Sequence, residues 1–271
     1  MIALLMMIFI SSNSNALTNV EQETLTPHYA FSNYFGSGLY SGSDQELAVV
    51  NLPFTYEPEQ NGKFKYRFRL PVSLGFYNYD FDQIQDVEFP DSVSSLTLTT
   101  GIEFDHWVNS QLKLVPFLDL GLSVNLHMDE RAVIYASGIT SEYSFYAWQE
   151  KHMWLTRFQR AGYNANTAGL SDGFAAVETG LDMVLPWRFS IMNRPMYASM
   201  YAMYYWYLMD LVFDPDSIKP SHQNNAQEFG FTMGFDTPLN LFFVDVERLG
   251  LGIRKTNNLH VLRIIFNFPL D

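Results

Sequence analysis

The stretch from Lys63 to Phe76, K-F-K-Y-R-F-R-L-P-V-S-L-G-F, constrains the fold more than any other part of the chain. It alternates with the period of a β-strand, whose successive side chains point to opposite faces, and Pro71 is the one irregularity. One face is apolar and aromatic: Phe64, Tyr66, Phe68, Leu70, Val72, Leu74 and Phe76. The other carries cations and small residues: Lys63, Lys65, Arg67, Arg69, Ser73 and Gly75. A strand between lipid and a wet lumen needs this pattern, because hydrocarbon tolerates only apolar side chains.

The same alternation recurs along the chain. It is found in residues 52–56, 96–104, 112–126, 177–185, 229–235 and 249–253. The uncharged stretch from Met196 to Met209 is too short for a comfortable helical span, and a strand there would line one face with tyrosines. Since a tilted membrane strand takes about 9–11 residues, we expect about 12 strands, with about 10 or 14 as alternatives. An open sheet edge in lipid would leave backbone groups unpaired, so the expected fold is all-β, a closed antiparallel transmembrane β-barrel.

Composition narrows the class of protein further. The chain has 271 residues, a formal net charge of -13 and no Cys. Without Cys there is no disulfide framework, thiolate nucleophile or Cys-based metal site. The acidic balance argues against a nucleic-acid partner, which would require a basic surface.

The chain is expected to have three parts. Residues 1–16 resemble a cleaved secretory signal, because a short apolar run from Met1 to Ile10 is followed by Ser14-x-Ala16. Residues 17–45 lack a clean pattern, and we expect a lead-in to the barrel, a luminal segment or a first strand. Residues 46–271 are the expected barrel.

The region 139–170 leaves two interpretations open. Tyr143, Phe145 and Ala147 alternate as a strand does, and two strands joined by a folded extracellular loop fit the region. The spacing of Trp148, Trp154 and the residues after them also permits an amphipathic helix. We favour the pair of strands.

The C-terminal run His260–Asp271, H-V-L-R-I-I-F-N-F-P-L-D, places Leu262, Ile264, Phe266 and Phe268 on one face. It resembles the C-terminal β-signal by which outer-membrane barrels are recognised for insertion, although three residues follow Phe268. With the stretches 146–151, 153–158 and 252–268, the chain resembles a solitary outer-membrane autotransporter-type β-barrel. The resemblance implies a 12-stranded barrel without a long N-terminal passenger, and the short interval between residues 16 and 46 agrees with it.

Familiar catalytic patterns are missing from the sequence. It holds no Gly-rich phosphate loop, no H-E-x-x-H and no G-x-S-x-G. Outer-membrane phospholipases, which are of similar size, carry H-x-S-N-G, and that motif is also missing. The six His residues, at positions 28, 106, 127, 152, 222 and 260, do not have metal-ligand spacing. We therefore expect no catalytic residues, no cofactor and no metal.

The basic residues of the lumen face are the most informative candidates for a site. They are Lys63, Lys65, Arg67, Arg69, Arg248 and Arg254. One interpretation is a cationic lumen that favours anionic solutes or holds an acidic plug. The other pairs these cations with carboxylates of other strands as internal struts of a filled barrel. The candidate partners are Asp119, Glu178, Asp182, Glu228 and Asp236, and we favour the struts.

Two groups of residues are expected at the ends of the strands. Trp107, Trp187, Trp206 and Tyr77 suit an aromatic girdle at the lipid headgroups. The acids from Asp80 to Asp91 suit a solvated loop, with divalent-cation binding as the alternative.

These observations favour an integral outer-membrane barrel of a Gram-negative bacterium, without catalytic activity, acting as a structural protein or a narrow, porin-like pore. Its expected partners are outer-membrane lipid and lipopolysaccharide, and the barrel-assembly machinery during insertion. The alternatives are a secreted periplasmic β-sandwich or lipocalin-like binding module, and an outer-membrane lipid-modifying enzyme.

Overall fold

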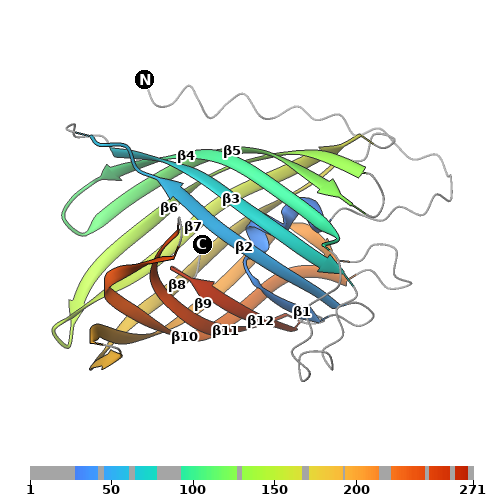
Figure 1. Ribbon diagram of the computed structural model, residues 1–271. Helices are drawn as coiled ribbons and strands as arrows, with labels where there is room; N and C mark the ends of the chain where they lie inside the picture. Colours follow the sequence, from blue (N-terminus) through green and yellow to red (C-terminus); the bar gives the residue numbers. More distant parts are fainter. Residues whose placement is uncertain are drawn as a thin grey trace.

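The computed structural model describes residues 28–41, 46–60, 65–77, 93–126, 130–166, 171–191, 193–213, 221–241, 244–256 and 260–267. Within them the chain forms a closed antiparallel barrel of 12 strands, in which each strand pairs with its sequence neighbours and β1 pairs with β12 (Figure 1). This confirms the fold class and the strand number expected from the sequence. The expected signal, residues 1–16, lies outside the described residues, as do the acids from Asp80 to Asp91.

The strand lengths differ around the barrel, from 4 residues in β1 to 21 in β8 and β10. The strands are β1 (Gly38–Ser41), β2 (Glu46–Tyr56), β3 (Lys65–Tyr77), β4 (Ser95–Trp107), β5 (Leu112–Asn125), β6 (Glu130–Ala147), β7 (Glu150–Ala165), β8 (Ser171–Ile191), β9 (Arg194–Phe213), β10 (Ser221–Leu241), β11 (Val244–Lys255) and β12 (His260–Phe266). Two short helices precede them, η1 (His28–Phe31) and α1 (Ser32–Phe35).

The two ends of the barrel differ in their connections. At one end β6 and β7 are joined by residues 148–149, and β8 and β9 by residues 192–193; we call this the short-turn end. At the other end the connections include residues 78–94 and 214–220, and we call it the long-connection end. No helix among the described residues is long and apolar enough to cross a membrane.

The alternation read from the sequence is the alternation between the two faces of the barrel wall. In β4, Thr97, Thr99 and Glu103 are buried in the lumen, whereas Leu96 and Leu98, which alternate with them, are exposed on the outer surface. The aromatic face of β3 also lies outside, with Phe68 39% exposed. A β-sandwich or lipocalin-like module would bury these apolar faces in its core. Here the apolar faces point outward and the polar faces point inward, which is the opposite arrangement.

The region 139–170 forms two long strands and not a helix. β6 and β7 pair without interruption from Ala132↔Ala165 to Ala147↔Glu150. The expected folded loop between them is wrong, because only Trp148 and Gln149 connect the strands. Both have positive φ, 52° and 66°, as in the tight hairpin turns whose twist matches that of the strands.

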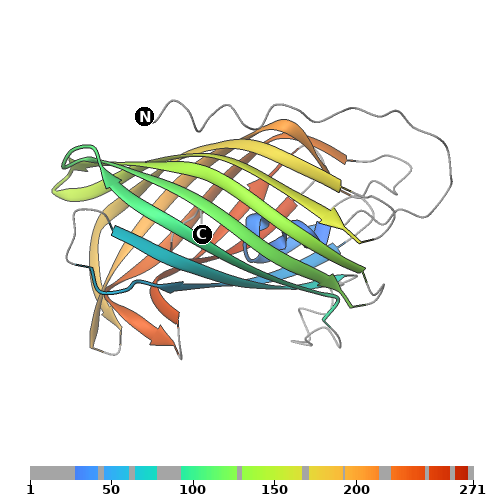
Figure 2. The same ribbon diagram turned by 90° about the horizontal axis from the view of Figure 1, so that it is seen from above.

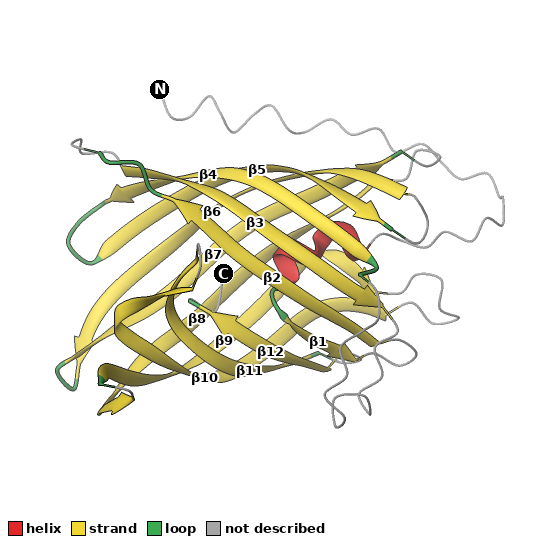
Figure 3. Cartoon of the chain, in the orientation of Figure 1, coloured by secondary structure: helices red, strands yellow, loops and turns green. Residues whose placement is uncertain are grey.

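The barrel begins earlier than the expected boundary at residue 46. β1 lies within the range expected as a lead-in and closes the sheet by pairing with β12 and β2. The helices η1 and α1, just before β1, lie inside the barrel toward the long-connection end (Figures 2 and 3). The N-terminal region therefore combines two of the expected alternatives, a luminal segment followed by a first strand.

Candidate functional site inside the barrel

The N-terminal segment 28–37 lies inside the lumen, and we call it the plug. Its polar side is held by β2, β3 and β4. Ser32 Oγ donates to Thr97 Oγ1 at 3.0 Å, and Asn33 Nδ2 donates to Thr99 Oγ1. Ser73 Oγ donates to Asn33 Oδ1. Because these groups are buried, each bond satisfies a polar atom that would otherwise carry a desolvation cost.

The apolar side of the plug packs against β7 and β8. The Phe31 ring lies 5.3 Å from the Tyr163 ring and 5.1 Å from the Phe174 ring, both edge to face. Ala30 and Phe31 are buried in a cluster with the small lumen-facing residues of β6 to β8, such as Ala161. The plug thus touches opposite walls of the barrel and fills the lumen between them.

The plug joins β1 through a tight bend at Gly36. Its φ of 80° is in the left-handed region, and a Cβ there would collide with the Arg263 guanidinium. Ser37 Oγ donates to the Asn51 carbonyl oxygen at 3.0 Å, and the Tyr40 hydroxyl donates to the Gly36 carbonyl oxygen at 2.8 Å. These contacts fix the plug to the barrel wall at the point where it leaves the lumen.

Next to the plug, the cations of β3 meet carboxylates of β4 and β5. Glu103 accepts from Arg67 Nε and, at 2.8 Å, from Arg69 Nη1. Arg69 Nη2 also lies 3.7 Å from the buried Asp119. Burial, and then the Asp119 carboxylate, raise the pKa of the Tyr34 phenol in the plug above its ordinary value. The two arginines and the two carboxylates thus form a first charged cluster, in which cations and carboxylates of neighbouring strands contact one another.

The network continues across β5, β6 and β7. Lys113 Nζ lies 2.8 Å from Glu142 Oε2. The Phe117 ring lies between two guanidinium groups, with Arg69 at 5.2 Å and Arg157 at 5.7 Å from its centroid. Such cation–π contacts stabilise charges that are partly withdrawn from water. Arg157 also donates to Thr140 Oγ1 at 3.1 Å.

A second cluster surrounds Glu228 on β10, which is fully buried. Arg254 Nε donates to Oε2 at 2.7 Å, and Arg263 Nη1 donates to Oε1 at 3.1 Å. The hydroxyls of Tyr201 and Tyr205 donate to the same carboxylate, at 2.7 and 3.0 Å. Four donors from β9, β11 and β12 therefore converge on one side chain.

A third cluster lies toward the short-turn end. Arg248 Nη1 donates to Asp182 Oδ2 at 2.7 Å, which connects β11 to β8. Arg248 also lies 3.3 Å from Ser199 Oγ, and its guanidinium is 5.8 Å from the Tyr197 ring centroid. Both charged groups of the Arg248–Asp182 pair are buried, as in the second cluster.

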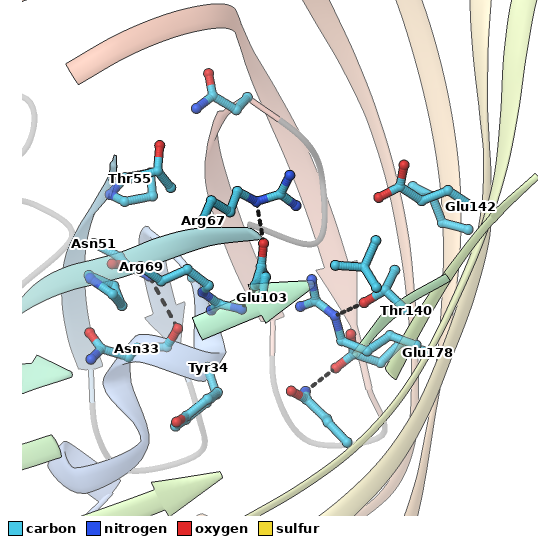
Figure 4. A pocket seen from close by; sticks show the side chains of 18 of the residues that line it. Asn33, Tyr34, Asn51, Thr55, Arg67, Arg69, Glu103, Thr140, Glu142 and Glu178 are labelled. Atoms are coloured by element: carbon cyan, nitrogen blue, oxygen red, sulfur yellow. Dashed lines mark hydrogen bonds and ion pairs between the residues drawn. The ribbon is translucent and has the colours of Figure 1, made fainter. Parts of the chain in front are cut away.

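A cavity of about 310 Å³ remains between the plug and the short-turn end. Asn33 and Tyr34 of the plug line it on one side, together with Thr55 near the end of β2 (Figure 4). Glu57, just after β2, also belongs to the lining. Its wall carries six cations and five carboxylates, which are Arg67, Arg69, Lys113, Arg157, Arg254, Arg263, Glu57, Glu103, Glu142, Glu178 and Glu247. The cavity is strongly polar but nearly balanced in charge.

The structure places the candidate residues as follows. Arg67, Arg69, Arg248 and Arg254 point into the lumen, and the last three lie against Asp119, Asp182 and Glu228, as in the strut interpretation. Lys65 is exposed at the start of β3, and Lys63 lies outside the described residues. Glu178 accepts from Gln159 at 2.6 Å, and Asp236 lies 3.6 Å from Arg188.

Several luminal residues were not predicted as part of the site from the sequence. Arg263 follows Leu262, so its position already placed it on the lumen face of the last strand. Arg157 and Glu103 were not singled out, although both alternate with outward apolar residues. The plug had no signal, because a helix of four residues shows no usable periodicity.

Two of the C-terminal candidates lie on the outer face. Leu262 and Ile264 are 38% and 44% exposed on β12, and Phe266 ends that strand. Phe268 lies outside the described residues. Among the expected girdle residues, Trp187 and Trp206 are exposed, and nothing is described of the Tyr77 side chain. The expectation is wrong for Trp107, which is exposed at the rim on the lumen side, where its ring centroid lies 5.8 Å from Lys113 Nζ. The part of the chain that the structure describes contains no group of three or more His, Asp or Glu able to hold a metal ion.

Comparison with known proteins yields a structural likeness. No protein-family model and no curated protein matches the chain. Among solved structures, it is similar to the beta domain of the Bordetella autotransporter BrkA, with 11% sequence identity and a TM-score of 0.41 over 86% of this chain and 96% of that one. The closed 12-stranded barrel fits an autotransporter-type barrel.

Proposed function

We propose that the protein is an integral outer-membrane β-barrel with a structural role, and that its lumen does not conduct ions in the resting state. The proposal includes no catalytic step and no cofactor. Its partners are outer-membrane lipid and lipopolysaccharide, with the barrel-assembly machinery acting on the last strand during insertion.

The membrane location is supported by the outer surface of the barrel. Large apolar side chains are exposed on strands all around it, including Phe68, Leu98, Leu120, Phe229 and Ile253, which are 39–63% exposed. In water so large an apolar surface would drive aggregation. In a bilayer the same surface is the one that a membrane barrel presents to lipid.

The non-conducting state is supported by the interior, and this is the observation that carries the proposal. The plug spans the lumen from Thr97 on β4 to Phe174 on β8, and behind it the cations lie within ion-pair distance of carboxylates. Charges neutralised in this way hold strands together and leave little fixed charge to select a permeating ion.

A narrow pore is the second candidate, supported by the cavity of about 310 Å³ between the plug and the short-turn end. In that function the plug would have to move, and the charged wall between Arg67 and Glu142 would become the path of the solute. The nearly balanced charge of that wall predicts weak selectivity.

Cell fractionation tests the proposed location. The full chain should sediment with outer membranes and remain there after washing with high salt or carbonate, which removes peripheral proteins. Recovery in the soluble periplasmic fraction would contradict it. Folded barrels also resist unfolding by detergent until heated, so a heat-dependent change of electrophoretic mobility should accompany the membrane fraction.

A further inference from the structure

The barrel wall has a gap in its strand pairing between β2 and β12. β1 lies between these strands, but it has only 4 residues, which pair with Glu46–Val49 of β2 and with His260–Arg263 of β12. Among the described residues, no strand lies between the remaining parts of β2 and β12, which continue toward the short-turn end (Figure 1). We call this interval the seam gap. It is narrow, since β11 approaches β2 although the two strands are not paired.

Ser37 forms the closed end of the seam gap, because it bonds to both of its edges. Its carbonyl oxygen accepts from the Ile264 N–H at 3.0 Å, and its hydroxyl accepts from the Asn51 N–H at 2.8 Å. Alternate residues of a strand direct their backbone groups to the same side, so those of Pro53 and Thr55 face the gap. Proline has no N–H, whereas Thr55 presents one there. A backbone donor that faces hydrocarbon is costly unless a polar partner reaches it.

The luminal cavity reaches the outer surface through the seam gap, because two residues of its lining point outward. Phe54 of β2 lies opposite Leu70, which is 42% exposed on the outer face. Glu247 of β11 is exposed between Val246 and Arg248, which are both buried. Phe54 and Glu247 come from the two sides of the gap, so the cavity continues between these strands to the outside.

The cavity contains a buried acceptor that needs a donor. Asn51 lines it and is only 5% exposed. Its Nδ2 donates to the Asn33 carbonyl oxygen at 3.2 Å, whereas its Oδ1 has no hydrogen-bond partner among the described residues. A buried acceptor without a donor carries a desolvation cost. Asn51 therefore indicates a ligand with N–H or O–H groups.

The charge of the wall from β3 to β6 favours a cationic group in this ligand. Three cations, Arg67, Arg69 and Lys113, lie within ion-pair distance of five carboxylates, which are Glu57, Glu103, Asp105, Asp119 and Glu142. Every cation of this wall is thus matched, and two carboxylates are in excess. An ammonium group, with three donors and one positive charge, suits both the excess charge and the Asn51 acceptor.

We propose that the seam gap admits the head of a phospholipid with a primary ammonium group into the luminal cavity. The ammonium lies against Asn51 Oδ1, the phosphate remains in the gap beside the Thr55 N–H, and the acyl chains stay outside against Phe54 and Leu70. The inference rests on the proposed function, since it requires insertion in the outer membrane. Short turns face the periplasm in bacterial barrels, which places the gap in the leaflet that contains phospholipid.

The order of groups along the path favours this ligand. From the lumen outward, the path presents an acceptor at Asn51, a donor at Thr55 and an apolar surface at Phe54. A phospholipid of this class carries its ammonium, phosphate and acyl chains in the same order. A soluble amine has nothing to place against Phe54, and an anionic phospholipid has no cation for the negative wall. The cavity volume of about 310 Å³ is at the lower end of the range for small-molecule pockets.

The test uses the folded full-length barrel in mild detergent. Binding of phosphatidylethanolamine is compared with that of phosphatidylglycerol with the same acyl chains, which keeps the phosphate and lacks the ammonium. Asn51→Leu removes the acceptor, and Thr55→Trp fills the gap at an exposed position. Ser137→Trp is the matched control, because Ser137 is exposed on β6, which β3, β4 and β5 separate from the gap. Each variant is first checked for heat-dependent mobility and for insertion into lipid vesicles, and Thr55→Trp tests the site even if Asn51→Leu fails to fold.

We expect wild type to bind phosphatidylethanolamine about tenfold more tightly than phosphatidylglycerol, as for one additional charged hydrogen-bonding group. Asn51→Leu should remove this preference. Thr55→Trp should weaken the binding of phosphatidylethanolamine about tenfold, and Ser137→Trp should not. Free phosphoethanolamine, which has no acyl chains, should not displace the lipid at a similar concentration.

Three results would contradict these expectations at different levels. Equal affinities of wild type for the two lipids, or of Thr55→Trp and Ser137→Trp for phosphatidylethanolamine in barrels that insert normally, would overturn the site and leave the proposed function intact. Displacement by free phosphoethanolamine would overturn the choice of a lipid ligand. Failure of wild type to insert into vesicles would overturn the proposed function itself.

Discussion

Arg254 lies directly opposite Glu228 on the neighbouring strand, and its Nε donates to Glu228 Oε2 at 2.7 Å inside the barrel. Its guanidinium also stacks on the Tyr205 ring, 4.0 Å from the centroid. Arg263 reaches the same carboxylate from the last strand. The seam between β10, β11 and β12 is therefore held by one acid and two cations, which makes it a sensitive place to test the role of the luminal charges.

Replacing Glu228 with Gln should destabilise the barrel by about 3–5 kcal/mol, because two buried guanidinium groups lose their counter-ion. Denaturant unfolding of the barrel in detergent micelles measures the change. Glu57→Gln is the matched control, since Glu57 lies at the exposed rim, 3.9 Å from Arg67, where an ion pair is worth about 0–1 kcal/mol. Equal stability of the two variants would show that the inner charges are not struts.

The double change of Arg67 and Arg69 to Glu should also destabilise the barrel. It would place two new carboxylates beside Glu103 and Asp119, which now lie against these cations. Lys65→Glu reverses one charge of the same sign at the exposed start of β3 and should leave the unfolding midpoint nearly unchanged. A double variant as stable as Lys65→Glu would contradict the strut interpretation.

The outer face can be tested at Phe68. Phe68→Arg should cost about 2–4 kcal/mol if this face meets the bilayer near its centre, and insertion into lipid vesicles should fall. Leu126→Arg, an outward residue just after the end of β5, should cost about 0–1 kcal/mol, because the penalty decreases toward the interface. If both variants insert as wild type does, the face does not contact lipid.

The barrel itself could be predicted from the sequence because its signal is repeated. Each strand contributes a weak alternation of apolar and polar residues. In the barrel this alternation separates outer side chains, such as Leu96, Leu98 and Leu120, from inner ones, such as Thr97, Thr99 and Asp119. The same rule predicted that the side chains of Arg67, Arg69, Arg248 and Arg254 face the lumen. Alternate positions along a strand point to opposite sides of the barrel wall.

Other features depend on contacts between distant residues, and the sequence carries no local trace of them. The plug is stabilised by Thr97, Thr99 and Tyr163, which lie far along the chain from Ser32. The turn at Trp148 and Gln149 was missed because neither residue is typical of positive φ. Which carboxylate meets which cation depends on the register of the strands, which alternation alone does not specify.

The seating of the plug can be followed with single cysteines, because the chain has none of its own. Ala161 belongs to the same buried cluster as Phe31, so a cysteine introduced there (Ala161→Cys) should react slowly with a small water-soluble thiol reagent. Adding Phe31→Ala removes the aromatic contacts with Tyr163 and Phe174, on the order of 3–5 kcal/mol, and should accelerate the reaction more than tenfold. Val246→Cys, outside the plug cluster, is the control and should react at the same rate with or without Phe31→Ala. A rate at Ala161→Cys that does not depend on Phe31 would show that the plug does not cover this wall.

The central claim, a membrane barrel whose lumen is closed by its own N-terminal segment and by paired charges, is tested most directly by recording single wild-type barrels in planar lipid bilayers. The account predicts that inserted wild-type protein is nearly silent, because the plug fills the lumen between Thr97 and Phe174 and the charges behind it are paired. Insertion is verified separately by protection from protease in vesicles, so that silence is not mistaken for absence. Steady, anion-selective conductance of wild type, shifted toward cations by the Arg67 and Arg69 to Glu change, would contradict the account.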